Sequence, residues 1–357
     1  MRATPFGFLG LKVSSNAMDI QLIQSLVETW GPPGREGRIR DVIAQHLQGL
    51  VDETRVDRMG NLIALKRATQ KPAGGQAPLK VMLSAHMDEI GFVVTHVDEK
   101  GFVRFTNVGG LRAISLLGNR VIFENGTLGT IQVDKGFLSS ESAPKMTELF
   151  IDVGAADAAS APVKVGDMGA LLGTLAAQGD RLIAKSMDDR VGCAVAIAAL
   201  RQLKQTPHDI YAVFSVQEEV GIRGARTSAY AVNPDVGIAL DVTGTGDIPE
   251  ATPMAVSLGK GAAIKVQDSS VIADPRLRAL MVQRAKEARI PYQLEVLAAG
   301  GTDTAAIQMA REGVPAGCIS IPCRYIHSIS EMADARDVQA CVDLLAAVLS
   351  KPILIGD

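Results

Sequence analysis

Apolar residues recur along the chain with spacings that predict a mixed α/β fold. Residues 19–50 carry apolar side chains at helical intervals, interrupted once by the segment GPPGREG. After Arg181, short apolar runs alternate with helical segments, as in RLIAKS followed by DDRVGCAVAIAALRQL. Runs without polar alternation are typical of strands buried on both faces. The pattern therefore predicts an α/β fold in which an open sheet carries helices on both faces.

The stretch between residues 91 and 178 has a different pattern of apolar and polar residues. Short β-type runs such as FVVTHV, FVRFTNV and LFIDVGA are separated by turn residues, and little of the stretch has helical period. We expect residues 91–178 to form a small β-barrel-like dimerisation domain, inserted into a catalytic α/β domain of residues 18–90 and 179–357. Residues 1–17 are expected to be a loosely ordered extension, because their apolar patch is too short for a signal peptide.

Composition narrows the class of protein. A chain of 357 residues with 47% hydrophobic and 21% charged residues is typical of a globular protein with a large core. The net charge of −3 gives no electrostatic reason to expect nucleic acid or a membrane surface as a partner. Without a CxxC pair, the cysteines are expected to be small core residues of a reducing compartment, so the cytoplasm is the expected location. They are Cys193, Cys318, Cys323 and Cys341.

Polar residues follow five of the expected strands at the point where each strand ends. Active sites of open α/β sheets form outside the carboxyl ends of the strands. One such residue alone is usually a helix cap or part of a solvated face. Five together at one edge would repel one another unless cations lie among them. The residues are His86 and Asp88 after VMLSA, Asp188 and Asp189 after RLIAKSM, Glu218 and Glu219 after YAVFSVQ, Asp241 after VGIAL, and His327 after GCISIPCRYI.

This combination of imidazole and carboxylate predicts a metal cluster, and it suits zinc, cobalt or manganese. The segments that carry it resemble the M42 family of metallo-aminopeptidases, which includes the tetrahedral and glutamyl aminopeptidases. The resemblance extends over nearly the whole chain from about Met18. Seven segments carry it: SAHMDEIGFVV, APKMTELFIDVGA, KSMDDRVGCAV, SVQEEVGIRGA, ALDVTGT, GGTDTAAI and IPCRYIHS.

The resemblance implies two divalent metal ions per subunit. His86, Asp188 and Asp241 would hold one ion. Asp188, Glu219 and His327 would hold the other, so that Asp188 bridges the pair. One departure from the family follows His327: Ile329 and Ser330 stand where relatives commonly carry Pro-Val. We expect it to reshape the rim of the specificity pocket without removing a ligand.

The resemblance also implies roles for residues around the ions. Glu218 would be the general base and acid, and Asp88 would orient His86. Arg190 and Asp189 would support the bridging carboxylate, although Asp189 is equally suited to cap the following helix. Thr302 and Asp303, in the GGTD segment, would lie near the substrate. The remaining histidines are expected to be structural; they are His46, His96 and His208.

The implied activity is hydrolysis of N-terminal residues from peptides that have a free N-terminus. The implied assembly is a homo-oligomer, in which dimers form through the inserted domain and build a hollow dodecamer. Two alternatives remain at this point: a related co-catalytic metal deacylase or carboxypeptidase, and a non-catalytic peptide-binding scaffold. Paired carboxylates also serve glycoside hydrolases. The aromatic fraction of 4%, with one tryptophan, is poor for a sugar-binding platform.

Overall fold

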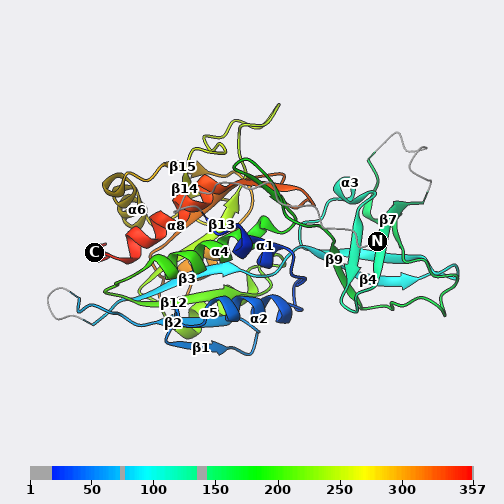
Figure 1. The fold of residues 1–357 in the computed structure, drawn as a ribbon, viewed down its shortest axis with the longest axis horizontal. Helices are drawn as coiled ribbons and strands as arrows, with labels where there is room; N and C mark the ends of the chain where they lie inside the picture. The colour runs from blue at the N-terminus through cyan, green and yellow to red at the C-terminus, as the bar shows by residue number, and fades with distance from the viewer. Residues whose placement is uncertain (1–17, 73–76, 135–142, 356–357) are drawn as a thin grey trace, which may run out of the picture.

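The computed structural model describes residues 18–72, 77–134 and 143–355, and in them the predicted open α/β sheet with an inserted β-barrel is confirmed (Figure 1). Within these residues, eleven strands form the main sheet, nine of them in the order β1–β2–β12–β3–β13–β16–β17–β11–β10, while β14 pairs with β16 and β15. Their bounds are β1 (Glu53–Val56), β2 (Leu62–Lys66), β3 (Lys80–His86), β10 (Ala176–Gln178), β11 (Arg181–Ala184), β12 (Asp209–Ser215), β13 (Val236–Thr243), β14 (Ala262–Gln267), β15 (Tyr292–Val296), β16 (Ala316–Arg324) and β17 (Glu331–Asp334).

The centre of this sheet is parallel and its outer strands are antiparallel. β12, β3, β13 and β16 run parallel to one another. β2 pairs antiparallel with β12 on one side, and β17 with β16 on the other. Every residue of β13 is buried, as the run VGIAL predicts for a strand covered on both faces. The parallel centre therefore brings several carboxyl ends to one edge of the sheet.

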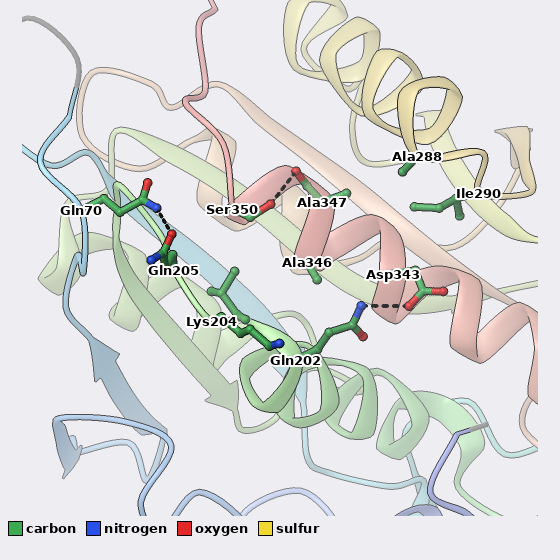
Figure 2. A pocket seen from close by; sticks show the side chains of 11 residues that line it. Gln70, Gln202, Lys204, Gln205, Ala288, Ile290, Asp343, Ala346, Ala347 and Ser350 are labelled. Atoms are coloured by element: carbon green, nitrogen blue, oxygen red, sulfur yellow. Dashed lines mark hydrogen bonds between the residues drawn. The ribbon is translucent and has the colours of Figure 1, made fainter. Parts of the chain in front are cut away.

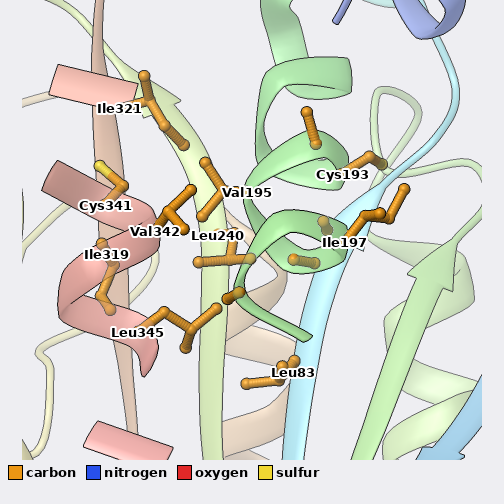
Figure 3. Close-up of a cluster of buried hydrophobic side chains, with 14 of the residues drawn as sticks. Leu83, Cys193, Val195, Ile197, Leu240, Ile319, Ile321, Cys341, Val342 and Leu345 are labelled. Carbon is orange, nitrogen blue, oxygen red and sulfur yellow. The ribbon is translucent and has the colours of Figure 1, made fainter. Parts of the chain in front are cut away.

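Helices cover both faces. α4 and α8 pack on one face of β3, β13 and β16, and α1 and α6 pack against them; α5 and α7 contact β12 and β13 from the other face. Figure 3 shows the core on the first face, where Ile197 of α4 and Leu345 of α8 lie around Leu240 of β13. Burying each such side chain contributes roughly 1.5–3 kcal/mol. The helices are α1 (Ile20–Val27), α2 (Gly37–His46), α4 (Met187–Gln202), α5 (Arg223–Val232), α6 (Pro275–Ala288), α7 (Asp303–Gln308) and α8 (Ala335–Leu349).

The inserted segment closes into a barrel at one end of the elongated molecule, far from the C-terminus (Figure 1). The strand order is β4–β5–β8–β7–β6–β9. The barrel has its own core, in which Phe92 meets Phe105 and Phe123 edge to face, with ring centroids 5.3 and 5.4 Å apart. Its elements are β4 (Gly91–Val97), β5 (Val103–Val108), α3 (Ala113–Leu116), β6 (Arg120–Phe123), β7 (Leu128–Val133), the 3-10 turn η3 (Met146–Glu148), β8 (Leu149–Asp152) and β9 (Met168–Leu171).

The four cysteines are buried and free, as predicted. None of the helices in the described part of the chain is long and apolar enough to cross a membrane. The extension predicted for residues 1–17 lies outside the described residues.

Candidate active site

The predicted metal ligands converge at the carboxyl edge of the parallel strands. His86 is the last residue of β3, and its Nε2 lies 2.9 Å from Oδ1 of Asp188. His327 follows β16, and its Nε2 lies 3.3 Å from the other oxygen of Asp188 and 3.3 Å from Oε2 of Glu219. The carboxylate of Asp188 therefore lies between the two histidines, with one oxygen toward each.

Two overlapping groups of side chains have the geometry to hold a cation. Ligand atoms of His86, Asp188 and Glu219 all lie within 4.8 Å of one another, and so do those of His86, Asp189 and Asp241. Asp241 thus lies with His86, as predicted from the resemblance. Asp189 joins it there, although the resemblance does not imply Asp189 as a ligand.

Asp189 and its neighbour Arg190 have contacts that decide between their predicted roles. Oδ1 of Asp189 accepts the main-chain N–H of Gly192 at 3.1 Å, so Asp189 caps the regular part of α4. Arg190 is fully buried and donates from Nη1 to the carbonyls of Leu26 and Thr29, at 2.7 and 2.9 Å. Its Nη2 donates to the carbonyl of Gly31 at 3.3 Å, and its Nε has no partner in the described structure. The guanidinium therefore binds the main chain at and after the end of α1, and in the described residues it makes none of the predicted hydrogen bonds to the bridging carboxylate.

Asp88 contacts the glutamate pair more closely than it contacts His86. Its two carboxylate oxygens accept the main-chain N–H groups of Glu218 and Glu219, at 3.0 and 3.1 Å. Nδ1 of His86 lies 3.1 Å from the main-chain oxygen of Asp88 and 3.6 Å from its carboxylate. Asp88 thus fixes the loop after β12 with its side chain and meets His86 chiefly through its backbone.

In the GGTD segment, Gly300 and Gly301 are exposed, whereas Thr302 and Asp303 are buried. Thr302 caps α7, accepting the N–H of Thr304. Asp303 is only 1% exposed, and its Oδ2 accepts the hydroxyls of Ser84 and Ser215, at 2.6 and 2.5 Å. Its Oδ1 has no hydrogen-bond partner in the described structure.

Two buried glutamates at the site escaped the sequence analysis. Glu331, on β17, accepts the main-chain N–H groups of Asp188 and His327, at 3.0 and 2.8 Å. Glu89 pairs with buried Lys185, with Oε2 and Nζ 2.5 Å apart. The partners of Glu331 are main-chain N–H groups, which a sequence does not identify. Glu89 stands directly after Asp88, and that position could have marked it as a residue near the site.

Comparison with known proteins supports the resemblance of the chain to the M42 family. Residues 60–344 match the sequence pattern of the M42 glutamyl aminopeptidases. This chain belongs to the M42 family of aminopeptidases. It is 36% identical over 352 residues to a lysyl aminopeptidase of Pyrococcus furiosus, covering 94% of this chain and 97% of that protein. An M42 aminopeptidase is a hydrolase that acts as an exopeptidase, so the chain is an enzyme.

Solved structures of related peptidases share the fold of the M42 chain. An aminopeptidase from the archaeon Desulfurococcus kamchatkensis superposes with a TM-score of 0.88 at 37% identity, covering 94% of this chain and 95% of that one. PhTET1-12s, solved with a dodecamer in the asymmetric unit, superposes with a TM-score of 0.84 at 28% identity, covering 93% and 99%. Close structural relatives of the M42 chain are therefore tetrahedral peptidases that form dodecamers.

Acidic side chains outnumber basic ones at the M42 site. Burial, followed by the charge of Asp188, raises the pKa of Asp241 well above its ordinary value, and burial likewise raises the pKa of Glu218. Hydrogen bonds to Asp188 and Glu219 outweigh burial and raise the pKa of His327 to about 11. All three shifts favour the protonated form, as expected where carboxylates crowd together without a cation among them.

This donor set fits the metal ions expected of an M42 metallopeptidase. Oδ2 of Asp189 and Oε1 of Glu219 are buried and have no hydrogen-bond partner in the described structure. A buried carboxylate oxygen without a partner is costly. A divalent cation among the carboxylates would satisfy these oxygens and offset the excess negative charge.

The barrel contributes directly to the M42 site. A methyl group added at Gly110, after β5, would come within 2.2 Å of Nδ1 of His327. One added at Gly109 would come within 3.2 Å of Glu219. Ile329, the family departure behind His327, packs against the core of the barrel. The site is therefore bounded by the sheet edge on one side and by the barrel on the other.

A pocket elsewhere on the molecule is unconnected with this chemistry. It has a volume of about 800 Å³ and lies among Gln202 at the end of α4, Ala288 at the end of α6, and Ser350 just beyond α8 (Figure 2). α4 begins at the site and ends at this pocket. Its 16 residues span about 24 Å, so the pocket lies at the opposite edge of the sheet.

Proposed function

We propose that this M42 aminopeptidase hydrolyses the first peptide bond of peptides with two divalent ions bound side by side. His86, Asp188 and Asp241 would hold one ion, and Asp188, Glu219 and His327 would hold the other. The arrangement of Asp188 carries this proposal, because its two oxygens lie 2.9 and 3.3 Å from the imidazoles of His86 and His327. A carboxylate with one oxygen toward each ligand set is suited to bridge two cations.

Bound divalent ions supply positive charge that acidifies water and polarises a peptide carbonyl. Glu218 is the side chain proposed to move the protons: it would take one from the attacking water and give it to the leaving amine as the C–N bond breaks. Two features support this role. Glu218 lies outside both cation-holding groups, and burial raises the pKa of its carboxyl, which favours uptake of a proton.

The ligand atoms indicate which metals can bind, and the family indicates the class of substrate. Imidazole and carboxylate ligands without a thiolate suit zinc or cobalt, and also manganese. The substrate is proposed to be a peptide with a free N-terminus, with Thr302 and Asp303 near it as predicted. The relatives are named for different residues, lysyl for one and glutamyl for another, so the preferred side chain has to be measured.

The test is an activity assay on protein stripped of metal by a chelator. Hydrolysis of Leu-, Glu- and Lys-p-nitroanilide is followed before and after addition of Co²⁺ or Zn²⁺, beside an N-acetylated peptide. We expect metal to restore release from the free-amine substrates only. Glu218→Gln should lower the restored rate by about 10²–10⁴-fold. Glu312→Gln, at an exposed glutamate, is the matched control and should leave it unchanged.

The alternatives give different outcomes in the same assay. A deacylase or carboxypeptidase would cleave the N-acetylated peptide and leave the free-amine substrates intact. A peptide-binding scaffold would cleave none of them although it bound metal in stoichiometric amount. Either result would contradict the proposal.

A further inference from the structure

Glu331 has no cationic partner, although it is almost completely buried. It is 1% exposed, and within the described ranges no lysine, arginine or histidine forms an ion pair with its carboxylate. Burying a carboxylate without a partner disfavours folding unless strong hydrogen bonds compensate. The compensating bonds come from the main-chain N–H groups of Asp188 and His327, one to each carboxylate oxygen.

These two donors belong to the residues that flank the proposed second ion. Asp188 precedes the regular part of α4, in a segment with non-helical dihedral angles, so no helix bond fixes its position. His327 has a φ of 64°, in the left-handed region that is uncommon for residues other than glycine. Both backbones need an external support, and the single carboxylate of Glu331 provides it to both.

The same construction occurs on the other side of the site. Asp88 accepts the N–H groups of Glu218 and Glu219 with its two oxygens. Two buried carboxylates thus hold the main chain of four site residues, two residues each. Hydrogen bonds are directional, so these four restrict where the attached side chains lie.

We propose that Glu331 is a positioning residue for the second metal ion, acting through the backbones of Asp188 and His327 rather than as a ligand. This inference rests on the proposed two-metal function. A carboxylate is required because both of its atoms accept. In Glu331→Gln one of the two atoms becomes a donor and faces an N–H group, so one of the two supports is lost.

The test is a titration of chelated protein with Co²⁺ alone, followed by calorimetry and by the absorbance of bound cobalt. Wild-type protein should bind two equivalents. Glu331→Gln should bind the second about 10–100-fold more weakly, the loss typical when a group that orients a metal ligand is removed. Glu331→Asp keeps both acceptor oxygens and should recover part of this affinity. If the glutamine variant does not fold, Glu331→Asp is titrated in its place.

Asp337→Asn is the matched control. Asp337 is also buried, and its two oxygens accept the N–H groups of Gly259 and Gly261, at 2.6 and 2.7 Å, neither of which is a proposed ligand. It should lower the thermal midpoint but leave both Co²⁺ affinities unchanged. If Glu331→Gln behaved in the same way, its role would be only structural and the proposal would be overturned. If wild-type protein bound fewer than two Co²⁺ ions, the two-metal function itself would fail, and this inference with it.

Discussion

Asp188 and Asp189 are adjacent in sequence and have different roles in the site. Asp188 faces both histidines, whereas Asp189 caps α4 with Oδ1 and has a carboxylate oxygen within 4.8 Å of ligand atoms of His86 and Asp241. The peptide bond between them is cis. Two neighbouring carboxylates thus serve both the start of a helix and the site beside it.

Glu36 gives a prediction of pH dependence at the scale of one residue. It is buried, and its Oε1 accepts the N–H groups of Gly34 and Gln217. Burial, and then the charge of Asp88, raises its pKa from 4.5 to about 7. Between these values the native state keeps a proton that the unfolded chain releases, so the free energy of unfolding of the metal-free protein falls as the pH rises through this interval.

Glu36→Gln should remove that fall, which amounts to at most about 3 kcal/mol for a shift of this size. Urea unfolding of chelated protein at several pH values from 5 to 8 measures it. Glu99→Gln, at an exposed glutamate, should follow the wild-type curve. An undiminished pH slope in Glu36→Gln would show that Glu36 titrates normally in the folded protein.

Residues that follow apolar strands could be predicted from the sequence, and residues that act on the backbone could not. His86 ends β3, Asp241 lies near the end of β13 and His327 follows β16, so the architecture alone indicates that they meet. Glu331 lies in a four-residue strand, and its partners are main-chain N–H groups, which every sequence has. Its contribution becomes visible only when the fold brings Asp188 and His327 together.

At the scale of elements, the loop after β5 connects the barrel to the metal site. Gly110 has no positive φ, so its backbone would accept alanine, yet the added methyl would lie 2.2 Å from Nδ1 of His327. The side chain of His327 would have to move. Gly110→Ala should therefore weaken binding of the second Co²⁺ ion and lower aminopeptidase activity by at least about tenfold, through loss of ligand geometry.

The control for this variant is Gly37→Ala, at the first residue of α2, where the nearest atom to the added methyl is the tip of Arg40 at 3.7 Å. It should leave activity and metal affinity unchanged. Full Co²⁺ affinity in Gly110→Ala would mean that the barrel loop moves aside freely and does not constrain His327.

The elements that sequence patterns identified are those with long apolar runs. β3, β12 and β13, and the helices α4 and α8, bury enough continuous apolar surface to be recognised. β14 was missed because Lys265 interrupts its apolar run; that lysine is buried between Glu295 and Asp268. β9, β10 and β17 have three or four residues each, too few to show a period. β10 and β17 belong to one antiparallel margin of the sheet, whereas the strands of the opposite margin, β1 and β2, were predicted as a strand pair.

At the scale of the whole molecule, the barrel and the sheet each supply a wall of the active site. Contacts between subunits that involve the loop after β5 would therefore lie close to the proposed second metal ion. The dodecamer formed by a structural relative motivates the same proposal for this chain. Such an assembly has a mass of about 450 kDa, against 37.6 kDa for one chain.

Light scattering of purified protein eluting from a sizing column measures this mass. We expect the dodecamer, with a dimer of about 75 kDa as the building unit when the assembly is diluted or its metal is removed. A monomer at micromolar concentration would contradict the proposed assembly and leave the account of the single active site unaffected.

The central claim is that two ions share Asp188, and anomalous diffraction from crystals of the zinc-loaded enzyme tests it most directly. The account predicts two peaks at the zinc edge. Each should lie about 2.0–2.2 Å from a carboxylate oxygen of Asp188, one beside His86 and Asp241 and the other beside Glu219 and His327. A single peak, or two peaks of which one does not contact Asp188, would contradict it.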